Sequence, residues 1–287
     1  MIALSIALAL FAALGNAAAS VLQRRAAAAD PPDTSGGRLV GRFGFVRRPA
    51  WSWGAGLLIV SGAAQALALA TGPLAVVQPV MATELLFTLV VAAVVFRWPP
   101  GAQAWGAFVG MALGLAAFLL LAGPTGGMET APPKRWLFSA VPAIAVSIVL
   151  VVVGAGLRGS ARAATLGTVT AIGFSFTAAL VKDLLGLLGG SGGVFTSWQI
   201  YTAAAVGLGS FLMLQATLRA GSLAASQPAL TLGDALLSVV LGVSLFEEQI
   251  TIGWRLLPEV ASLGLIALAC VRLNRSPLVS GKEARRW

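Results

Sequence analysis

Long apolar segments constrain this chain more strongly than any other feature of its sequence. They have the length of roughly 17 to 25 residues that an α-helix needs to cross about 30 Å of hydrocarbon, and they are apolar on every face. Backbone groups inside a bilayer must be hydrogen-bonded within the protein, so only helices and closed barrels span it, and barrel strands would alternate apolar and polar residues. We therefore expect an all-α integral membrane protein embedded in the lipid bilayer.

We predict about nine transmembrane helices. The first has no basic residue before it, whereas Arg24 and Arg25 follow it, which is typical of a span whose N-terminus is outside. The alanine run at 26–29 leaves a cleaved signal peptide as the alternative. The predicted spans are residues 2–22, 51–71, 73–96, 103–122, 136–157, 163–181, 194–218, 223–245 and 254–271.

The basic residues indicate how the spans are oriented. With the N-terminus outside, a basic loop at 23–50 and a basic tail at 274–287 both lie in the cytoplasm, where Lys and Arg concentrate. This topology explains the net charge of +9 without a nucleic-acid partner, and it predicts a multi-pass protein of the cell membrane with a cytoplasmic C-terminus. Of the 19 basic residues, the other side holds only Lys134, Arg135, Lys182 and Arg255.

A motif in the third span recurs in the eighth. GPLAVVQPVMATE (Gly72–Glu84) matches GSLAASQPALTLGD (Gly221–Asp234) at an offset of 149 residues, and one inserted residue in the second copy brings the two acids into correspondence. If spans one to four match spans six to nine, the fifth forces the second set to enter from the opposite face. We expect two inverted four-helix repeats joined by a linking helix, an architecture common among secondary transporters. The predicted domains are 1–122 (first repeat), 123–162 (linker with span five), 163–273 (second repeat) and 274–287 (tail).

Two acidic residues, Glu84 and Asp234, lie near the middle of their predicted spans. A central Asp costs about 2.5 to 3.5 kcal/mol on insertion scales, so an intramembrane acid is by default a functional group, here for proton coupling or cation binding. The alternative is that each acid is protonated, or hydrogen-bonds to neighbours such as Gln65 and Gln215, and only fixes helix packing.

Four polar residues complete the predicted binding site for a substrate or coupling ion. Gln78 and Gln227 each precede a proline, which would kink the span and leave a backbone carbonyl without its N–H donor. The glutamine amide can hydrogen-bond to that carbonyl or can contact a ligand. A kink needed only for packing accounts for the same pattern. Asn16 and Gln65 lie inside the first two spans and are candidates to line a cavity. A bound metal cation would be held by the two acids.

Enzymatic chemistry finds little support in the sequence. The chain has no histidine and a single cysteine, Cys270, which excludes His-metal sites, Cys–His catalysis and disulfides within the chain. No Ser–Lys pair occurs at a recognisable spacing. We therefore expect neither an enzyme nor a cofactor.

Two further patterns concern packing and solvation. Gly106, Gly110 and Gly114 form a GxxxGxxxG face on the fourth span, which predicts a close helix contact, either internal or in a homodimer. Charged residues at the predicted outer ends of spans are expected to be solvated; these are Lys182, Asp183, Glu247 and Glu248.

Several segments together give the chain a family likeness. It resembles the drug/metabolite transporter (DMT) superfamily, in particular the EamA-like and NIPA-like nine-span branch that includes magnesium transporters. The resemblance covers most of residues 1–275 and implies a two-repeat bundle that works by alternating access. Small multidrug resistance relatives use a glutamate in their first helix, where this chain has only Asn16. The segments are RRPAWSWG (Arg47–Gly54), QALALATGPLAVVQP (Gln65–Pro79), FTAALVKDLL (Phe176–Leu185), LQATLRAGSLAASQP (Leu214–Pro228) and FEEQ (Phe246–Gln249).

Three functions are consistent with these observations. The first is a secondary transporter of a small organic metabolite or drug-like solute, in which the two acids could couple transport to protons. The second is a NIPA-like magnesium transporter, because the intramembrane polar groups are the oxygen donors that a hard divalent ion requires. The third is a membrane scaffold or assembly partner that binds through the glycine face and uses the acids only structurally.

Overall fold

The computed structural model describes residues 2–28, 49–95, 127–189, 194–220 and 223–249, together with isolated residues between 102 and 118 and residues 264 and 268. Within these ranges the regular structure is helical, and seven segments are long and apolar enough to cross a membrane. The expected all-α membrane fold is confirmed at this level. The predicted spans 103–122 and 254–271 lie largely outside the described residues, so the total of nine stays a prediction.

The helices follow the predicted spans, although some ends differ by up to six residues and one span is divided. The first helix is longer than expected and extends to Ala28, and the third span is divided into two helices. The elements are α1 (Ile2–Ala28), α2 (Pro49–Thr71), α3 (Leu74–Met81), α4 (Glu84–Val95), α6 (Pro133–Gly156), α7 (Gly159–Gly186), α8 (Trp198–Ala220) and α9 (Leu223–Phe246), with short 3₁₀ turns at Leu187–Gly189 and Val194–Thr196.

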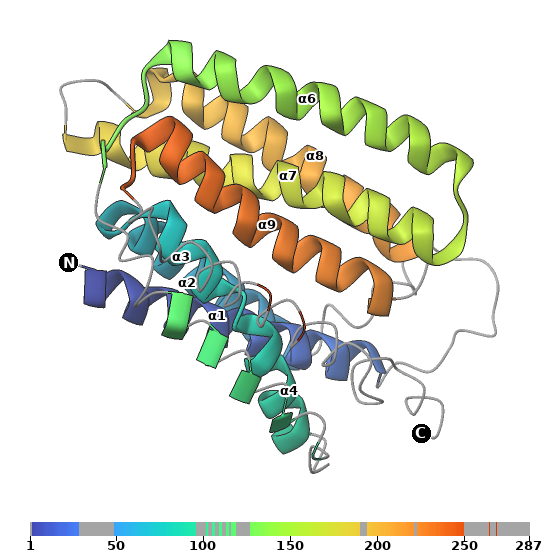
Figure 1. The fold of residues 1–287 in the computed structure, drawn as a ribbon. Helices are drawn as coiled ribbons and strands as arrows, with labels where there is room; N and C mark the ends of the chain where they lie inside the picture. Colours follow the sequence, from blue (N-terminus) through green and yellow to red (C-terminus); the bar gives the residue numbers. More distant parts are fainter. Residues whose placement is uncertain are drawn as a thin grey trace.

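The described helices form two groups that lie side by side (Figure 1). In the first group α1 packs along α2, and in the second α7 packs along both α8 and α9. The groups meet where α3 packs against α9 and where α2 packs against α7. One end of the assembly, which we call the α1-start end, gathers the first residues of α1, α3 and α6 and the last residues of α2, α7 and α9 (Figure 1).

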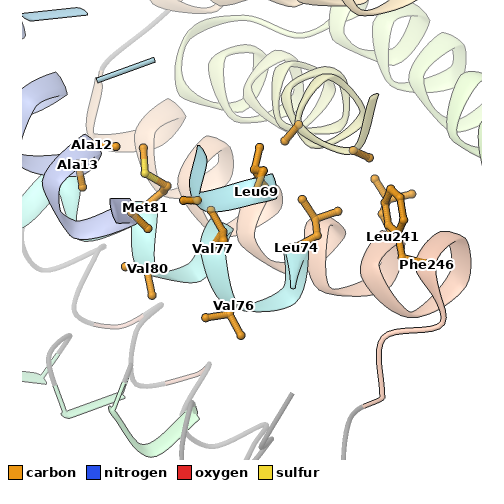
Figure 2. Close-up of a cluster of buried hydrophobic side chains, with 14 of the residues drawn as sticks. Ala12, Ala13, Leu69, Leu74, Val76, Val77, Val80, Met81, Leu241 and Phe246 are labelled. Atoms are coloured by element: carbon orange, nitrogen blue, oxygen red, sulfur yellow. The ribbon is translucent and has the colours of Figure 1, made fainter. Parts of the chain in front are cut away.

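The short helix α3 is the buried centre of the fold, because every residue from Leu74 to Met81 is buried. Figure 2 shows Leu74 beside Leu241 and Phe246 of α9, while Met81 at the other end lies toward α1. Lipid is as apolar as these side chains, so the contacts stabilise the fold through close van der Waals packing more than through exclusion of water. Both helix groups are therefore packed onto the same short helix.

Helix α6 shows the opposite pattern. Only Trp136 and Gly154 are buried along its 24 residues, whereas Phe138 keeps 81% of its surface exposed and Ile144 keeps 59%. An apolar surface of this extent is unsuited to water and suits contact with lipid chains. The helix therefore lies on the outside of the bundle, as Figure 1 shows.

The third span, predicted over 73–96, is found at Leu74–Val95, but it is broken into two helices instead of being one helix kinked at Pro79. Helix α3 ends at Met81, residues 82 and 83 form a turn, and α4 begins at Glu84. Pro79 cannot donate to the preceding turn, but the break itself lies at Thr83. Its N–H and its hydroxyl both donate to the carbonyl of Val80, at 3.0 and 2.7 Å, so the chain tightens and α4 leaves the direction of α3 (Figure 1).

Candidate functional site

Glu84 is placed by the break in the third span. It is the first residue of α4, where the helix dipole favours a negative charge. Its Oε2 accepts a hydrogen bond of 3.2 Å from the Nδ2 of Asn16, which lies 68 residues earlier on α1. The structure thus brings together two of the predicted site residues, and the partner of the acid is Asn16 rather than Gln65.

Asp234 has a similar setting on α9. Its Oδ1 accepts a hydrogen bond of 2.8 Å from the hydroxyl of Ser175 on α7, and the same hydroxyl lies 3.1 Å from the backbone carbonyl of Asp234. Ser175 is fully buried, and the carbonyl of Ala171 in its own helix lies 2.9 Å from the same hydroxyl as an alternative acceptor for its single proton. Ser175 thus links α7 to α9 and is the hydrogen-bond partner of the second acid.

The remaining predicted site residues are Gln78, Gln65 and Gln227. Gln78 is buried, with 4% of its surface exposed, in the middle of α3. Gln65 is half-buried on α2, and Gln227 belongs to α9 with a side chain outside the described part of the structure. Their predicted roles therefore stay predictions.

The glycine face of the fourth span is described only at isolated positions. Gly106 is exposed, Gly110 is half-buried and Gly114 is buried. A Cβ added at Gly106 would meet no atom within 4 Å. The homodimer contact predicted for this face stays a prediction.

The prediction that the charges at span ends are solvated is wrong for three of the four residues. Glu248 retains 2% of its surface and Asp183 retains none, and the Lys182 side chain retains 11%. Glu247 alone is exposed, at 54% of its side chain, and it pairs with Arg135 at the start of α6. Charges at span ends are usually in contact with water or headgroups, but here the chain folds over them.

Glu248 caps the buried helix α3 across the boundary between the two helix groups. Its Oε1 accepts the N–H of Leu74 at 2.6 Å and its Oε2 accepts the N–H of Ala75 at 2.8 Å. These are two of the four N–H groups that an α-helix leaves unpaired at its start, and the helix dipole adds to their attraction for a carboxylate. A carboxylate from after α9 thus satisfies the start of a helix 173 residues earlier.

Lys182 of α7 neutralises this carboxylate. Its Nζ lies 3.4 Å from Oε1 of Glu248, donates to the carbonyl of Gly72 at 2.7 Å, and lies 5.3 Å from the centre of the Phe246 ring. Leaving one charge of such a buried pair without its partner costs about 3 to 5 kcal/mol. We call Lys182, Glu248 and the first turn of α3 the inter-group clasp.

The backbone and a glycine make room for the clasp. Glu247 has φ of 54°, in the left-handed region, which turns the chain back at the end of α9. The N–H of Glu248 then donates to the carbonyl of Gly242 at 3.1 Å. A Cβ at Gly242 would collide with the Glu248 carboxylate. The only sequence signal for this arrangement is the glycine that precedes the acid by two helical turns, and it is too common a feature to have identified it.

Asp183 is a second buried carboxylate beside the clasp, with different partners. It accepts hydrogen bonds from the backbone N–H of Ala131 at 2.7 Å, from Nε1 of Trp136 at 3.1 Å and from Nε2 of Gln199 at 3.1 Å. Its role is to join α7 to α6, to α8 and to the segment before α6.

No group of three or more His, Cys, Asp or Glu side chains gathers among the described residues.

Comparison with known proteins adds one relative. A protein of Corynebacterium glutamicum, described only as uncharacterized, is 26% identical over 287 residues, which cover 98% of each chain. No protein-family model matches the chain, and no solved structure matches it. The two proteins are thus similar along nearly their whole length.

Proposed function

We propose that this protein is a secondary transporter that moves a small organic solute by alternating access, with Glu84 and Asp234 as proton-coupling or cation-binding groups. The observation that carries the proposal is the setting of the two acids. Each lies within a span and accepts a hydrogen bond from an uncharged side chain on the first helix of its own helix group. Neither hydrogen bond supplies a positive charge, so each carboxylate is available to a proton or a cation.

The similar setting of the acids supports two structurally related repeats. In the first group a carboxylate on the third span is bonded from α1, and in the second a carboxylate on α9 is bonded from α7. Close contacts between glycine and serine at two helix crossings also support the repeat. A Cβ added at Gly15 of α1 would collide with Ser61 of α2, and one added at Gly173 of α7 would collide with Ser210 of α8. Glycine opposite serine at both crossings is what two copies of one packing unit would retain.

The break before Glu84 also supports transport. Discontinuous helices with a charged or ion-binding group at the break recur in secondary transporters, because freed backbone groups and a helix terminus can bind a solute near the middle of the membrane. Here α3 ends at Met81 and α4 begins with the acid itself. The proposal thus assigns a functional reason to a break that disrupts an otherwise regular span.

The family resemblance leads to the same proposal. The DMT superfamily combines two inverted repeats with transport, and we place the chain near its EamA-like and NIPA-like branch. The Corynebacterium relative is itself uncharacterized and suggests no substrate. The magnesium alternative has no acidic cluster in its favour among the described residues, so we give it second place.

Transport by purified protein in proteoliposomes tests the proposal. Candidate solutes come from a thermal-shift screen of amines, amino acids, lipophilic cations and Mg²⁺ at two pH values. Glu84→Gln and Asp234→Asn should each abolish transport driven by a pH gradient while leaving a folded, monodisperse protein. Glu247→Gln, which changes an exposed carboxylate by the same chemistry, is the control and should retain transport.

Two results would change the conclusion. Full pH-driven transport by both acid variants would refute the assigned roles. Failure to transport any solute, together with a defined complex that Gly110→Leu disrupts, would instead favour the scaffold function.

A further inference from the structure

We propose that the inter-group clasp is the gate of this transporter at the α1-start end, and that the structure shows the gate closed. This inference rests on the proposed function and adds a part of the molecule that neither the acids nor the repeat motif includes. It requires three properties of the clasp: that it joins the two groups, that it closes one end only, and that its bonds are exchangeable.

The clasp joins groups that must separate in alternating access. Glu248 follows α9 and Lys182 is on α7, both in the second group, whereas the N–H groups of Leu74 and Ala75 and the carbonyl of Gly72 belong to the first. The side-chain hydrogen bonds that Glu248 and Lys182 make to Leu74, Ala75 and Gly72 therefore cross the boundary. Moving the groups apart at this end would break all three of the crossing hydrogen bonds.

The clasp closes only one end of the bundle. At the α1-start end α3 packs against α9, with Leu74 beside Phe246 (Figure 2). Beyond the turn at residues 82 and 83 the span changes partner, because α4 packs against α1 and diverges from α9 (Figure 1). Among the described residues, the contact between α3 and α9 thus holds the two groups together at the α1-start end, whereas α4 makes no comparable contact with α9. A transporter closed on one side of the membrane has this asymmetry.

The bonds of the clasp suit a gate that opens repeatedly. A charge pair and helix-cap hydrogen bonds are lost when the ends separate, but water and headgroups at a span end can replace them, which lipid in the middle of the membrane cannot do. Lys182 and Glu248 lie in or just after the last turns of α7 and α9, where such replacement is available. The apolar contacts of α3 would then become the exposed wall of the opened end.

A single-cysteine reporter tests the gate. Cys270→Ser removes the native thiol, and Ala75→Cys places a small thiol at a position with 0% exposure beneath the clasp. A membrane-impermeant maleimide is applied to each face of sealed vesicles. We expect slow labelling in the reporter protein, and labelling about tenfold faster or more from one face in Glu248→Gln, because an open state of about 1 to 10% becomes the major one.

Further variants separate gating from folding. The double variant Lys182→Met/Glu248→Gln removes both charges and leaves neither alone, and Gly242→Ala displaces the carboxylate without changing a charge; both should also label faster. Glu247→Gln breaks the neighbouring exposed pair with Arg135 and should leave the rate unchanged. All variants are compared at matched monodispersity and thermal stability.

The outcomes distinguish this inference from the proposed function. Unchanged labelling in folded Glu248→Gln and Gly242→Ala proteins overturns the gate even if transport is found. Faster labelling in both, from the same face, supports an opening at this end even if no solute is transported, in which case the proposed transport function fails. The labelled face also reports which side of the membrane the α1-start end occupies.

Discussion

The three hydrogen bonds of Asp183 permit a quantitative test of how this protein is held together. Asp183→Asn keeps the size of the side chain but leaves one carbonyl oxygen and one NH₂ group to face three donors. Those donors are the N–H of Ala131, the indole of Trp136 and the amide of Gln199. At least one of them must lose its acceptor, whichever way the new amide is turned.

The expected loss follows from the burial of the site. A hydrogen bond to a charged group contributes about 1.5 to 3 kcal/mol, and a buried donor left without a partner costs a similar amount. Asp183 has 0% exposure, so water does not replace the lost acceptor while the fold is intact. We expect Asp183→Asn to lower the free energy of unfolding by about 3 kcal/mol. Trp136→Phe, which removes one donor and retains an aromatic ring, should lower it by about 1.5 kcal/mol.

A double-mutant cycle measures the interaction itself. Unfolding is followed in mixed micelles by titration with a denaturing detergent, for both single variants and for the double variant. Asp183→Asn replaces the charged acceptor of the Trp136 hydrogen bond by a neutral one, and Trp136→Phe removes its donor. Because the two changes act on the same hydrogen bond, the double variant should lose less than the sum by about 1 kcal/mol. Trp198→Phe is the control. The Trp198 ring packs edge-on against Trp136, with 5.7 Å between the ring centroids, but Trp198 is not one of the donors to Asp183. Additivity within about 0.5 kcal/mol would refute the assignment.

Two further substitutions test the backbone and the helix crossings. Glu247→Gly should be more stable than Glu247→Ala by about 1 kcal/mol. Both variants lose the pair with Arg135, but only glycine adopts the left-handed φ of 54° without strain. Equal thermal unfolding temperatures of the two variants would contradict this. Gly15→Ala should lower the free energy of unfolding by about 1 to 3 kcal/mol, because the added methyl group collides with the hydroxyl of Ser61. Ser61→Ala in the same chain should restore much of that loss, since the Ser61 Cβ lies at an ordinary 3.4 Å from the added methyl group. A loss that Ser61→Ala leaves unchanged would mean that the crossing is not the cause.

The acids could be found from the sequence, but their partners could not. Glu84 and Asp234 stand out because charge inside an apolar run is costly wherever the helix packs. Asn16 and Ser175 lie 68 and 59 residues away from them, and contact at that separation depends on how each helix is rotated. Apolar runs that are apolar on every face carry little information about rotation. The sequence therefore predicted the depth of the acids and left their neighbours open.

The clasp was missed because a general rule was applied where packing overrides it. Charges at span ends are solvated in most membrane proteins, and this correctly describes Glu247, but Glu248 beside it is buried. The difference depends on the left-handed turn at Glu247 and on the unpaired start of α3. Neither feature has a distinct residue pattern. The break at Thr83 was not predicted for a related reason, because the sequence indicates a kink at Pro79, one turn earlier.

Helix α3 connects the two features that matter most for the proposed cycle. It has eight residues and a length of about 12 Å at 1.5 Å per residue, with the clasp at its first turn and Glu84 three residues after its last. Its residues are all buried, and the turn at residues 82 and 83 connects it to α4. Opening the clasp would free the first turn from Glu248 and change the angle between α3 and α4. The bond between Glu84 and Asn16 spans α4 and α1, so it would be strained or released by the same movement. In this mechanism the gate and the proton- or cation-binding acid are coupled mechanically through one short, buried helix.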